Sequence, residues 1–349
     1  MKKVLILSGV IVGLIAALSA KTLADAGQFK RITAHSDYSF IRIDGLPGPE
    51  DISIDQDTGM AFISCDDRRA SMAGREQQGA IYGLNLQIEG SQPLNLTADF
   101  TKAFHPHGIS LFRTTAGELL LFAINHNEDS QYVEIFEYQN NRLQYRESIS
   151  HPLLYSPNDL VAVGPRSFYA TNSHGSTSVF GQLTEDLLQL SRAYVVYFDG
   201  NKLQIADSGF QYANGINVSR DGRQLYVSTT VGKSLHVYSR DPASGLLTAQ
   251  KKIKLNSGAD NIESGSDGSL YIACHPKLFT FLAHAQSSKN DSPSQVFKIT
   301  LDKSYNYITE EIFLDDGSFF SGSSVAAAYG ELLLLGQVFE DSILLGRRR

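Results

Sequence analysis

The sequence has few cysteines, no tryptophan and no block of basic residues. Its 349 residues include two cysteines, Cys65 and Cys274, and no Cys-x-x-Cys pair, which excludes a disulfide-rich scaffold and a thiolate zinc site. There are 30 Lys and Arg against 37 Asp and Glu, a formal charge of −7, so nucleic acid is not expected as a partner. Hydrophobic residues at 42% and charged residues at 19% exclude extended disorder and are typical of a globular protein.

A single long hydrophobic run is present, at the N-terminus. Lys2 and Lys3 precede the apolar residues 4–20, and Ala24-Asp25-Ala26 then provides a small-x-small cleavage site. We expect residues 1–26 to be an export signal cleaved after Ala26 or, because a bilayer requires roughly 20 apolar residues, an uncleaved anchor that associates the protein with a membrane. The protein is therefore predicted to be exported, either periplasmic or secreted.

The remainder of the chain repeats one pattern six times. Each copy contains a short segment of aromatic and branched residues after a turn, a composition typical of β-strands; these segments are residues 59–64, 117–125, 166–172, 223–229, 268–274 and 330–337. Before each segment lies a pair of polar or glycine residues, and these axial pairs recur 46 to 63 residues apart: Glu50-Asp51, His107-Gly108, Asn158-Asp159, Asn214-Gly215, Asp260-Asn261 and Ser323-Ser324. Such a repeat, with room for four strands, is typical of propeller blades. We predict an all-β, six-bladed β-propeller over residues 27–349 as a single domain, its ring closed by a strand at 40–43 or 343–345.

The axial pairs place many oxygen atoms at the hub of this predicted ring, because the first strand of each blade runs along the central channel. They bring together Glu50, Asp51, Asp159 and Asp260 without Lys or Arg, and such carboxylates repel one another strongly at low dielectric. A divalent cation removes this repulsion. Carboxylate and amide oxygens suit Ca²⁺, whereas zinc prefers His or Cys. Asn and Asp also favour turns, but metal-type donors at one register in five consecutive repeats favour a metal site.

Several motifs resemble those of the paraoxonase/arylesterase family in order and spacing. They are Gly48-Pro49-Glu50-Asp51, His107-Gly108-Ile109-Ser110, residues 158–165, Tyr194-Val195-Val196-Tyr197, Ala213-Asn214-Gly215-Ile216-Asn217, Asp260-Asn261-Ile262 and Ala273-Cys274-His275-Pro276. The resemblance covers residues 48–339 and implies two calcium ions in the central tunnel of a six-bladed propeller. It implies that an exposed catalytic ion is held by Glu50, Asn158, Asn214, Asp260 and Asn261, and a deeper structural ion by Asp51, Asp159 and the backbone carbonyl of Ile109.

The same resemblance implies calcium-dependent hydrolysis of lactones and aryl esters, assisted by the histidine pair His107 and His126. Calcium would polarise the carbonyl of a small-molecule substrate, His107 would deprotonate the attacking water, and His126 would orient His107 or relay its proton. A covalent serine is not required, and the chain has no Gly-x-Ser-x-Gly motif. A purely structural role for His126, and a direct role for Glu50 or Asp260 as base or nucleophile, remain alternatives.

The other histidines and the helical segment lead to further expectations. His174 and His275 are predicted to line the pocket, whereas His105, His151, His236 and His284 are expected at turns or on the surface. Residues 174–193 predict a short helical lid that begins at Thr184-Glu185-Asp186, with Leu183, Leu187, Leu188 and Leu190 on its apolar face. A helix packed on the propeller rim without covering the site is the alternative.

The sequence also departs from the family and leaves two other functions open. The family's best-known secreted members join their termini by a disulfide, but Leu345 stands at the C-terminal position here, so we expect two free thiols and a ring closed by hydrogen bonds and packing. One alternative function is that of a sugar lactonase similar to the gluconolactonase propellers, whose centres hold one metal. The other is a non-catalytic propeller that binds a ligand or partner and uses calcium only for stability.

Overall fold

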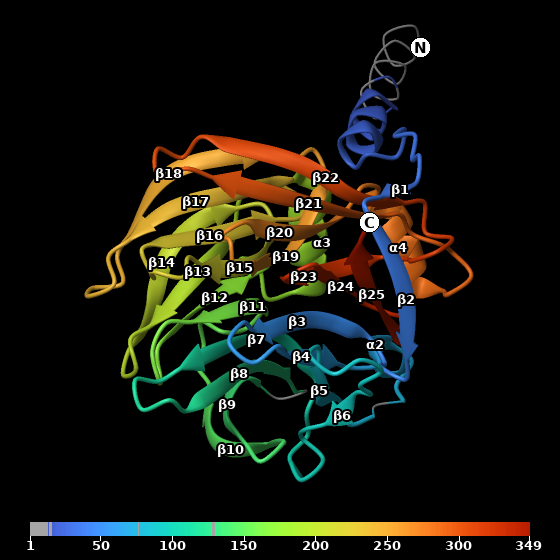
Figure 1. The fold of residues 1–349 in the computed structure, drawn as a ribbon. Helices are drawn as coiled ribbons and strands as arrows, with labels where there is room; N and C mark the ends of the chain where they lie inside the picture. Colours follow the sequence, from blue (N-terminus) through green and yellow to red (C-terminus); the bar gives the residue numbers. More distant parts are fainter. Residues whose placement is uncertain (1–12, 14–15, 76, 128–129) are drawn as a thin grey trace, which may run out of the picture.

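Each sequence repeat folds into an antiparallel sheet, and six such sheets surround one axis (Figure 1). The computed structural model describes residues 13, 16–75, 77–127 and 130–349, and within them the predicted all-β, six-bladed propeller is confirmed. From the axis outwards the blades are β3 (Pro49–Asp55), β4 (Met60–Cys65), β5 (Ala80–Asn85) and β6 (Leu94–Asn95); β7 (Pro106–Arg113), β8 (Leu119–His126), β9 (Gln131–Gln139) and β10 (Arg142–Ile149); β11 (Pro157–Ala162), β12 (Phe168–Asn172), β13 (Ala193–Phe198) and β14 (Leu203–Phe210); β15 (Ala213–Val218), β16 (Gln224–Thr229), β17 (Ser234–Arg240) and β18 (Leu247–Lys254); β19 (Gly258–Ser264), β20 (Leu270–His275), β21 (Ser294–Leu301) and β22 (Tyr307–Asp315); and β23 (Ser323–Tyr329), β24 (Leu332–Gln337) and β25 (Ser342–Arg348).

The ring is closed by both of the segments that the sequence suggested. Strand β2 (Tyr38–Asp44) pairs antiparallel with β25 over its full length, from Tyr38 opposite Arg348 to Asp44 opposite Ser342. The sixth blade thus takes its outermost strand from the N-terminal part of the chain, and the short β1 (His35–Ser36) adds to β22 of the fifth blade. Closure rests on hydrogen bonds and packing, since Cys65 and Cys274 are both buried, free thiols.

Apolar side chains fill the space between neighbouring blades. Phe122 of β8 and Phe168 of β12, for example, are fully buried and belong to one cluster that joins the second and third blades. The alternation of side chains along each strand supplies one apolar face to each neighbouring blade, and burial of such surface stabilises the fold by about 25 cal/mol per Å². The first strands contact one another in ring order, β3 with β7, β7 with β11 and so on to β23 with β3.

Besides the N-terminal helix, the described residues form three helices outside the sheets: α2 (Arg68–Met72), α3 (Val179–Leu188) and α4 (Leu278–Gln286). The helix predicted from Thr184 exists but begins earlier, at Val179, because Ser178 provides the N-cap and its hydroxyl accepts a hydrogen bond from Gly181 N at 3.1 Å. The predicted start at Thr184 was therefore wrong, and Thr184 lies in the middle of the helix. Neither α2 nor α4 was predicted from the sequence.

The N-terminal signal or anchor prediction falls largely outside the described residues. Of residues 1–26, the structure describes residue 13 and residues 16–26, and residues 16–25 are helical. Among the described residues, none of the helices is long and apolar enough to cross a bilayer. The end of the N-terminal helix contacts the propeller: Lys233 Nζ donates to Asp25 O at 2.6 Å, and Leu278 N donates to Ala26 O at 3.0 Å.

Candidate active site

The axial pairs lie where the pairing between the first two strands of each blade is interrupted. The register shifts between residues 49 and 51, 106 and 109, 157 and 160, 213 and 216, 259 and 262, and 323 and 325. A β-bulge releases side chains from the regular alternation of the pleat and redirects them. All six blades therefore direct these residues by the same local irregularity.

Two glycines of the axial pairs allow neighbouring blades to approach closely. A Cβ on Gly108 would lie 2.5 Å from the Cα of Asp159, and a Cβ on Gly215 would lie 2.5 Å from the carbonyl oxygen of Asp260. Such distances leave no room for a side chain at either position. The second and fourth blades therefore contribute one polar side chain each, from His107 and Asn214, while each of the other four blades contributes two.

The side chains expected to hold the catalytic ion are buried, and several of their oxygens accept no hydrogen bond from the described residues. Their exposed fractions are between 1% and 6%, and the residues are Glu50, Asn158, Asn214, Asp260 and Asn261. Four oxygens accept no hydrogen bond from the residues that the structure describes: Glu50 Oε2, Asn158 Oδ1, Asn214 Oδ1 and Asn261 Oδ1. Buried acceptors without a partner cost free energy. Their gathering in one set of axial pairs fits the oxygen ligands of a hard cation such as Ca²⁺.

Hydrogen bonds to neighbouring groups fix the orientation of two amides in this set. Asn261 Nδ2 donates to Glu50 Oε1 and to Glu50 O, each at 3.1 Å, and Asn214 Nδ2 donates to Thr230 Oγ1 at 2.8 Å. Since the amide nitrogens are occupied in this way, the carbonyl oxygens are the atoms left without partners. Both amides therefore present acceptors, which is what a cation requires.

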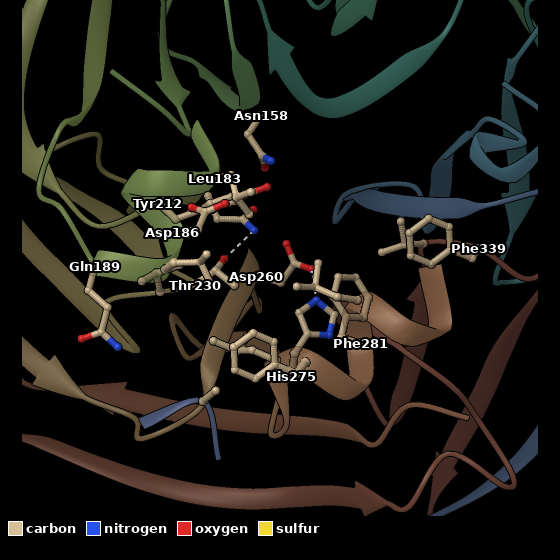
Figure 2. A pocket seen from close by; sticks show the side chains of 18 of the residues that line it. Asn158, Leu183, Asp186, Gln189, Tyr212, Thr230, Asp260, His275, Phe281 and Phe339 are labelled. Carbon is tan, nitrogen blue, oxygen red and sulfur yellow. Dashed lines mark hydrogen bonds and ion pairs between the residues drawn. The ribbon is translucent and has the colours of Figure 1, made fainter. Parts of the chain in front are cut away.

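Charge in this set is balanced in part by the protein itself. Burial would raise the pKa of Glu50, but the interaction with His107 and then with Arg68 lowers it to about 2. Burial raises the pKa of Asp260, although the hydrogen bond from His275 opposes this effect. His275 Nε2 lies 2.7 Å from Asp260 Oδ2 (Figure 2).

The two carboxylates assigned to the deeper ion accept backbone hydrogen bonds. Asp51 accepts from Ile52 N at 2.9 Å and from Ile109 N at 2.7 Å, and Asp159 accepts from Leu160 N at 2.7 Å and from Ile216 N at 2.8 Å. Burial raises the pKa values of both Asp51 and Asp159 well above the usual range, and repulsion from neighbouring carboxylates raises them further. A cation beside the two groups would oppose both effects.

Any metal at this hub would depend on amide and backbone oxygens as well as on carboxylates. In the part of the chain that the structure describes, no three His, Cys, Asp or Glu side chains are grouped so that they could hold a metal ion by themselves. The donor set nevertheless fits calcium better than zinc, since it consists of oxygens.

The two histidines expected to act in catalysis are in direct contact. His107 Nδ1 lies 2.7 Å from His126 Nε2, and His107 Nε2 lies 3.3 Å from Glu50 Oε1. Burial, and then the charge of His107, lower the pKa of His126 to about 3. His126 is therefore a neutral imidazole at ordinary pH, and it is held behind His107 as seen from the axial oxygens.

Glu50, Asn158, Asn214 and Asp260 of the axial pairs line a cavity of about 380 Å³. Figure 2 shows Asn158, Asp260 and His275 around it, with Leu183 of α3 on one side and Phe281 of α4 on the other. The remaining wall is mostly apolar, including Leu187, Leu278, Phe279, Leu282, Val338 and Phe339. The helix α3 thus forms part of the pocket, as the lid prediction required, rather than packing elsewhere on the rim.

The remaining histidines differ in whether they line the pocket and in how far they are buried. His275 lines the pocket. His174 does not; its Nε2 lies 3.1 Å from the carboxylate of Asp186, and it is Asp186 that lines the pocket. His105 and His151 lie in a loop and a turn, but the prediction was wrong for His236, which lies on β17, and for His284, which is 1% exposed within α4. The imidazole of His284 packs against the ring of Phe339, and its backbone carbonyl accepts from Arg69 Nη2 at 2.8 Å, a contact that joins α4 to α2.

Sequence reasoning missed several pocket residues, above all those of α4. The signal was present in the spacing of Leu278, Phe281 and Leu282, which is that of one helical face. Arg68 of α2 also lines the pocket, and its Nη2 lies 4.0 Å from Glu50 Oε2. Tyr212, another lining residue, has φ of 60°, a conformation that is costly for a bulky side chain and is often found at functional sites.

The family model and the similar proteins of known sequence indicate the same family. The family model "Arylesterase" matches residues 48–345. The chain is 34% identical over 307 residues to serum paraoxonase/arylesterase 2 of Bos taurus, and 33% identical over 313 residues to serum paraoxonase/arylesterase 1 of Homo sapiens, in each case covering 85% of both chains. It is also 33% identical over 305 residues to serum paraoxonase/lactonase 3 of Homo sapiens, again over 85% of both chains.

Solved structures share the fold at much lower identity. A luciferin-regenerating enzyme superposes with a TM-score of 0.57 at 10% identity, covering 89% of this chain and 95% of that one. A gluconolactonase from Xanthomonas campestris superposes with a TM-score of 0.54 at 14% identity, covering 91% of this chain and 94% of that one. These similarities show a common propeller architecture.

Proposed function

The chain belongs to the arylesterase family, whose members are esterase and lactonase hydrolases, and on this premise we propose that it hydrolyses aryl esters and lactones with calcium at the hub of the propeller. The observation that carries the proposal is a set of buried oxygens on Glu50, Asn158, Asn214 and Asn261 that accept no hydrogen bond among the described residues, beside the contact between His107 and His126. Two calcium ions are proposed, one catalytic and one structural.

The catalytic ion is proposed to be held by an upper set of five buried residues, which are Glu50, Asn158, Asn214, Asp260 and Asn261. Asp51, Asp159 and the carbonyl of Ile109 are proposed to hold the structural ion. A calcium ion in the upper set would supply Lewis acidity to the carbonyl group of the substrate. Glu50 and Asp260 supply two negative charges to the catalytic position, and Asp51 and Asp159 supply two to the structural position. Charge balance thus favours one divalent ion in each set.

His107 is proposed to act as the general base. Its Nδ1 is occupied by His126 at 2.7 Å, whereas its Nε2 faces the axial oxygens, 3.3 Å from Glu50 Oε1. A water molecule between Nε2 and the substrate carbonyl would lose its proton to this nitrogen as it attacks. The proton would then be available for the departing alkoxide or phenoxide.

The apolar wall is proposed to bind the organic part of the ester or lactone. Leu183 and Leu187 of α3 and Phe281 and Leu282 of α4 line the cavity, and their apolar surface favours burial of hydrocarbon. It also limits the number of water molecules around the reacting carbonyl, which strengthens the electrostatic interactions there.

The test is to assay phenyl acetate and a γ-lactone before and after removal of calcium. Treatment with EGTA is expected to abolish turnover of both substrates, and added Ca²⁺ is expected to restore it where Mg²⁺ does not. Undiminished turnover by calcium-free protein would overturn the proposal. The variant His107→Gln should lower kcat by about 10²- to 10⁴-fold, the usual contribution of a general base; hydrolysis that survives this change intact would point to a non-catalytic propeller.

We also propose that the protein is exported by residues 1–26, either as a cleaved signal or as a membrane anchor. The support is the basic start, the apolar run and the Ala24-Asp25-Ala26 site. Mass spectrometry of protein recovered from an expressing bacterium would give the N-terminal residue. Mature protein beginning at Gly27 is expected for a cleaved signal, and full-length protein in the membrane fraction for an anchor; full-length cytosolic protein would contradict both.

A further inference from the structure

A continuous line of contacts runs from the second blade to the axial oxygens. Gln131 Oε1 contacts His126 Nδ1, His126 Nε2 lies 2.7 Å from His107 Nδ1, and His107 Nε2 lies 3.3 Å from Glu50 Oε1. Gln131 belongs to β9 and pairs directly opposite His126 of β8 in the ladder, so the two side chains share one face of the sheet. The first member of the line, Gln131, is part of neither the motifs nor the metal set.

We propose that Gln131 is a positioning residue that fixes the tautomer of His126 and, through it, makes Nε2 the basic nitrogen of His107. This inference rests on the proposed function, because it concerns the general base of that reaction. It assigns a role to a side chain that touches neither substrate nor metal.

The orientation of the Gln131 amide is set by a second hydrogen bond. Gln131 Nε2 donates to the backbone carbonyl of Asn127 at 3.3 Å. A carbonyl oxygen can only accept, so the amide nitrogen must face Asn127 and the amide oxygen must face His126. Since Oε1 is likewise only an acceptor, the proton between these two residues must be carried by His126 Nδ1.

The position of that proton determines the rest of the line. A neutral imidazole carries one N–H, and His126 is neutral because burial and the neighbouring His107 lower its pKa to about 3. With the proton on Nδ1, His126 Nε2 is an acceptor and His107 Nδ1 must donate to it. Nε2 is then the nitrogen of His107 that exchanges a proton: when protonated it can donate to Glu50 Oε1, 3.3 Å away, and when unprotonated it carries the lone pair.

Removal of the amide removes this constraint. In Gln131→Leu, His126 would be free to carry its proton on Nε2 and to donate it to His107 Nδ1. His107 would then carry its own proton on Nε2, where it cannot accept one from water. Leucine has nearly the volume of glutamine, so the packing between β8 and β9 is largely retained.

The tautomer itself is measured first, on the wild-type protein loaded with calcium. Two-bond ¹H–¹⁵N correlation spectra of ¹⁵N-histidine-labelled protein distinguish a protonated ring nitrogen from an unprotonated one, and His126→Gln assigns the signals. We expect a protonated Nδ1 and an unprotonated Nε2 on His126. The opposite pattern overturns the inference whether or not the protein hydrolyses any ester, which keeps this result separate from the test of the proposed function.

Kinetics of three variants supply the second readout. Gln131→Leu should lower kcat for phenyl acetate at least about tenfold with KM nearly unchanged, since a correctly protonated base contributes about 10²- to 10⁴-fold. Gln131→Glu, whose carboxylate also only accepts, should retain the wild-type tautomer and recover most of the loss. Gln144→Leu, on the outer strand β10 of the same blade, is the matched control. Equal kcat in wild type and Gln131→Leu, or equal losses in the Leu and Glu variants, would overturn the inference.

Discussion

The ring of Phe281 is stacked on the imidazole of His275, with centroids 3.7 Å apart and an interplanar angle of 21°. His275 in turn holds the carboxylate of Asp260 at 2.7 Å, and Asp260 is one of the proposed calcium ligands. The helix α4 therefore reaches the proposed metal centre through one stacked pair and one hydrogen bond. Groups that orient a ligand in this way affect metal affinity without touching the metal.

Phe281→Ala is expected to weaken calcium binding at the catalytic position. Without the stacked ring, His275 gains freedom to rotate and its hydrogen bond to Asp260 is less well defined. The dissociation constant for calcium should rise up to about tenfold, the lower end of the effect of removing a group that orients a metal ligand directly, because Phe281 acts through His275. Calorimetric titration of calcium-free protein measures this change. Phe319→Ala, at a ring that is 46% exposed, should leave the constant unchanged, and equal affinities for both variants would contradict the expectation.

A pair of asparagines should respond in opposite ways to truncation. Asn158 Oδ1 is buried and accepts no hydrogen bond within the described part of the chain. Asn158→Ala should therefore change the free energy of unfolding of calcium-free protein by less than about 1 kcal/mol while reducing the rise in Tm that calcium produces. Asn125 is fully buried and its amide is satisfied by His105 N, Ala103 O and Glu134 Oε1.

Asn125→Ala should therefore destabilise the calcium-free protein by about 1 to 3 kcal/mol and leave the calcium-dependent rise in Tm intact. Thermal unfolding of both variants with and without calcium separates the two effects. If Asn158→Ala keeps the full calcium response, its amide is not a ligand.

The axial pairs could be identified from the sequence because a propeller places one register of every repeat in the same environment. Glu50, Asn158 and Asp260 recur at that register, so position along the repeat was enough to group residues more than 200 positions apart. The bulge that redirects them was not visible in the sequence, yet it recurs in all six blades. The recurrence of the axial pairs in the sequence was therefore sufficient to predict that these residues lie together at the axis.

The rest of the pocket could not be predicted because it does not repeat. Arg68 and α4 come from loops that differ in every blade, and their place depends on contacts such as Arg69 Nη2 to His284 O at 2.8 Å. The burial of His284 depends on such contacts between distant segments and has no local signature. The start of α3 depended on one capping residue, Ser178, whose preference is shared by many serines in loops.

The stability of the protein should fall as the pH drops below about 6.5, in part through His236. Burial, and then the charge of Lys252, lower the pKa of His236 from its usual 6.5 to about 4. Between these two values the unfolded chain binds a proton that the folded chain does not, so each step down in pH favours unfolding. The contribution should reach about 2 to 3 kcal/mol near pH 4 and be absent above pH 7.

Urea unfolding at several pH values, with calcium saturating, measures this slope. His236→Asn should show a shallower fall in the free energy of unfolding than wild type, and His35→Asn at the exposed β1 should not differ from wild type. Parallel curves for wild type and His236→Asn would show that the acid sensitivity arises elsewhere.

The leucines of α3 should determine the preference for the size of the acyl or lactone chain. Leu183 and Leu187 line the cavity, although they are 52% and 43% exposed, so each has one side available to a bound hydrocarbon chain. Leu183→Ala removes part of that surface and should lower kcat/KM for a long-chain γ-lactone relative to phenyl acetate by about 3- to 10-fold. The ratio of the two substrates is the measured quantity, because it cancels changes in the amount of active enzyme. Val179→Ala, in the first turn of the same helix and outside the lining, is the control. An unchanged ratio in Leu183→Ala would mean that α3 borders the pocket without selecting what enters it.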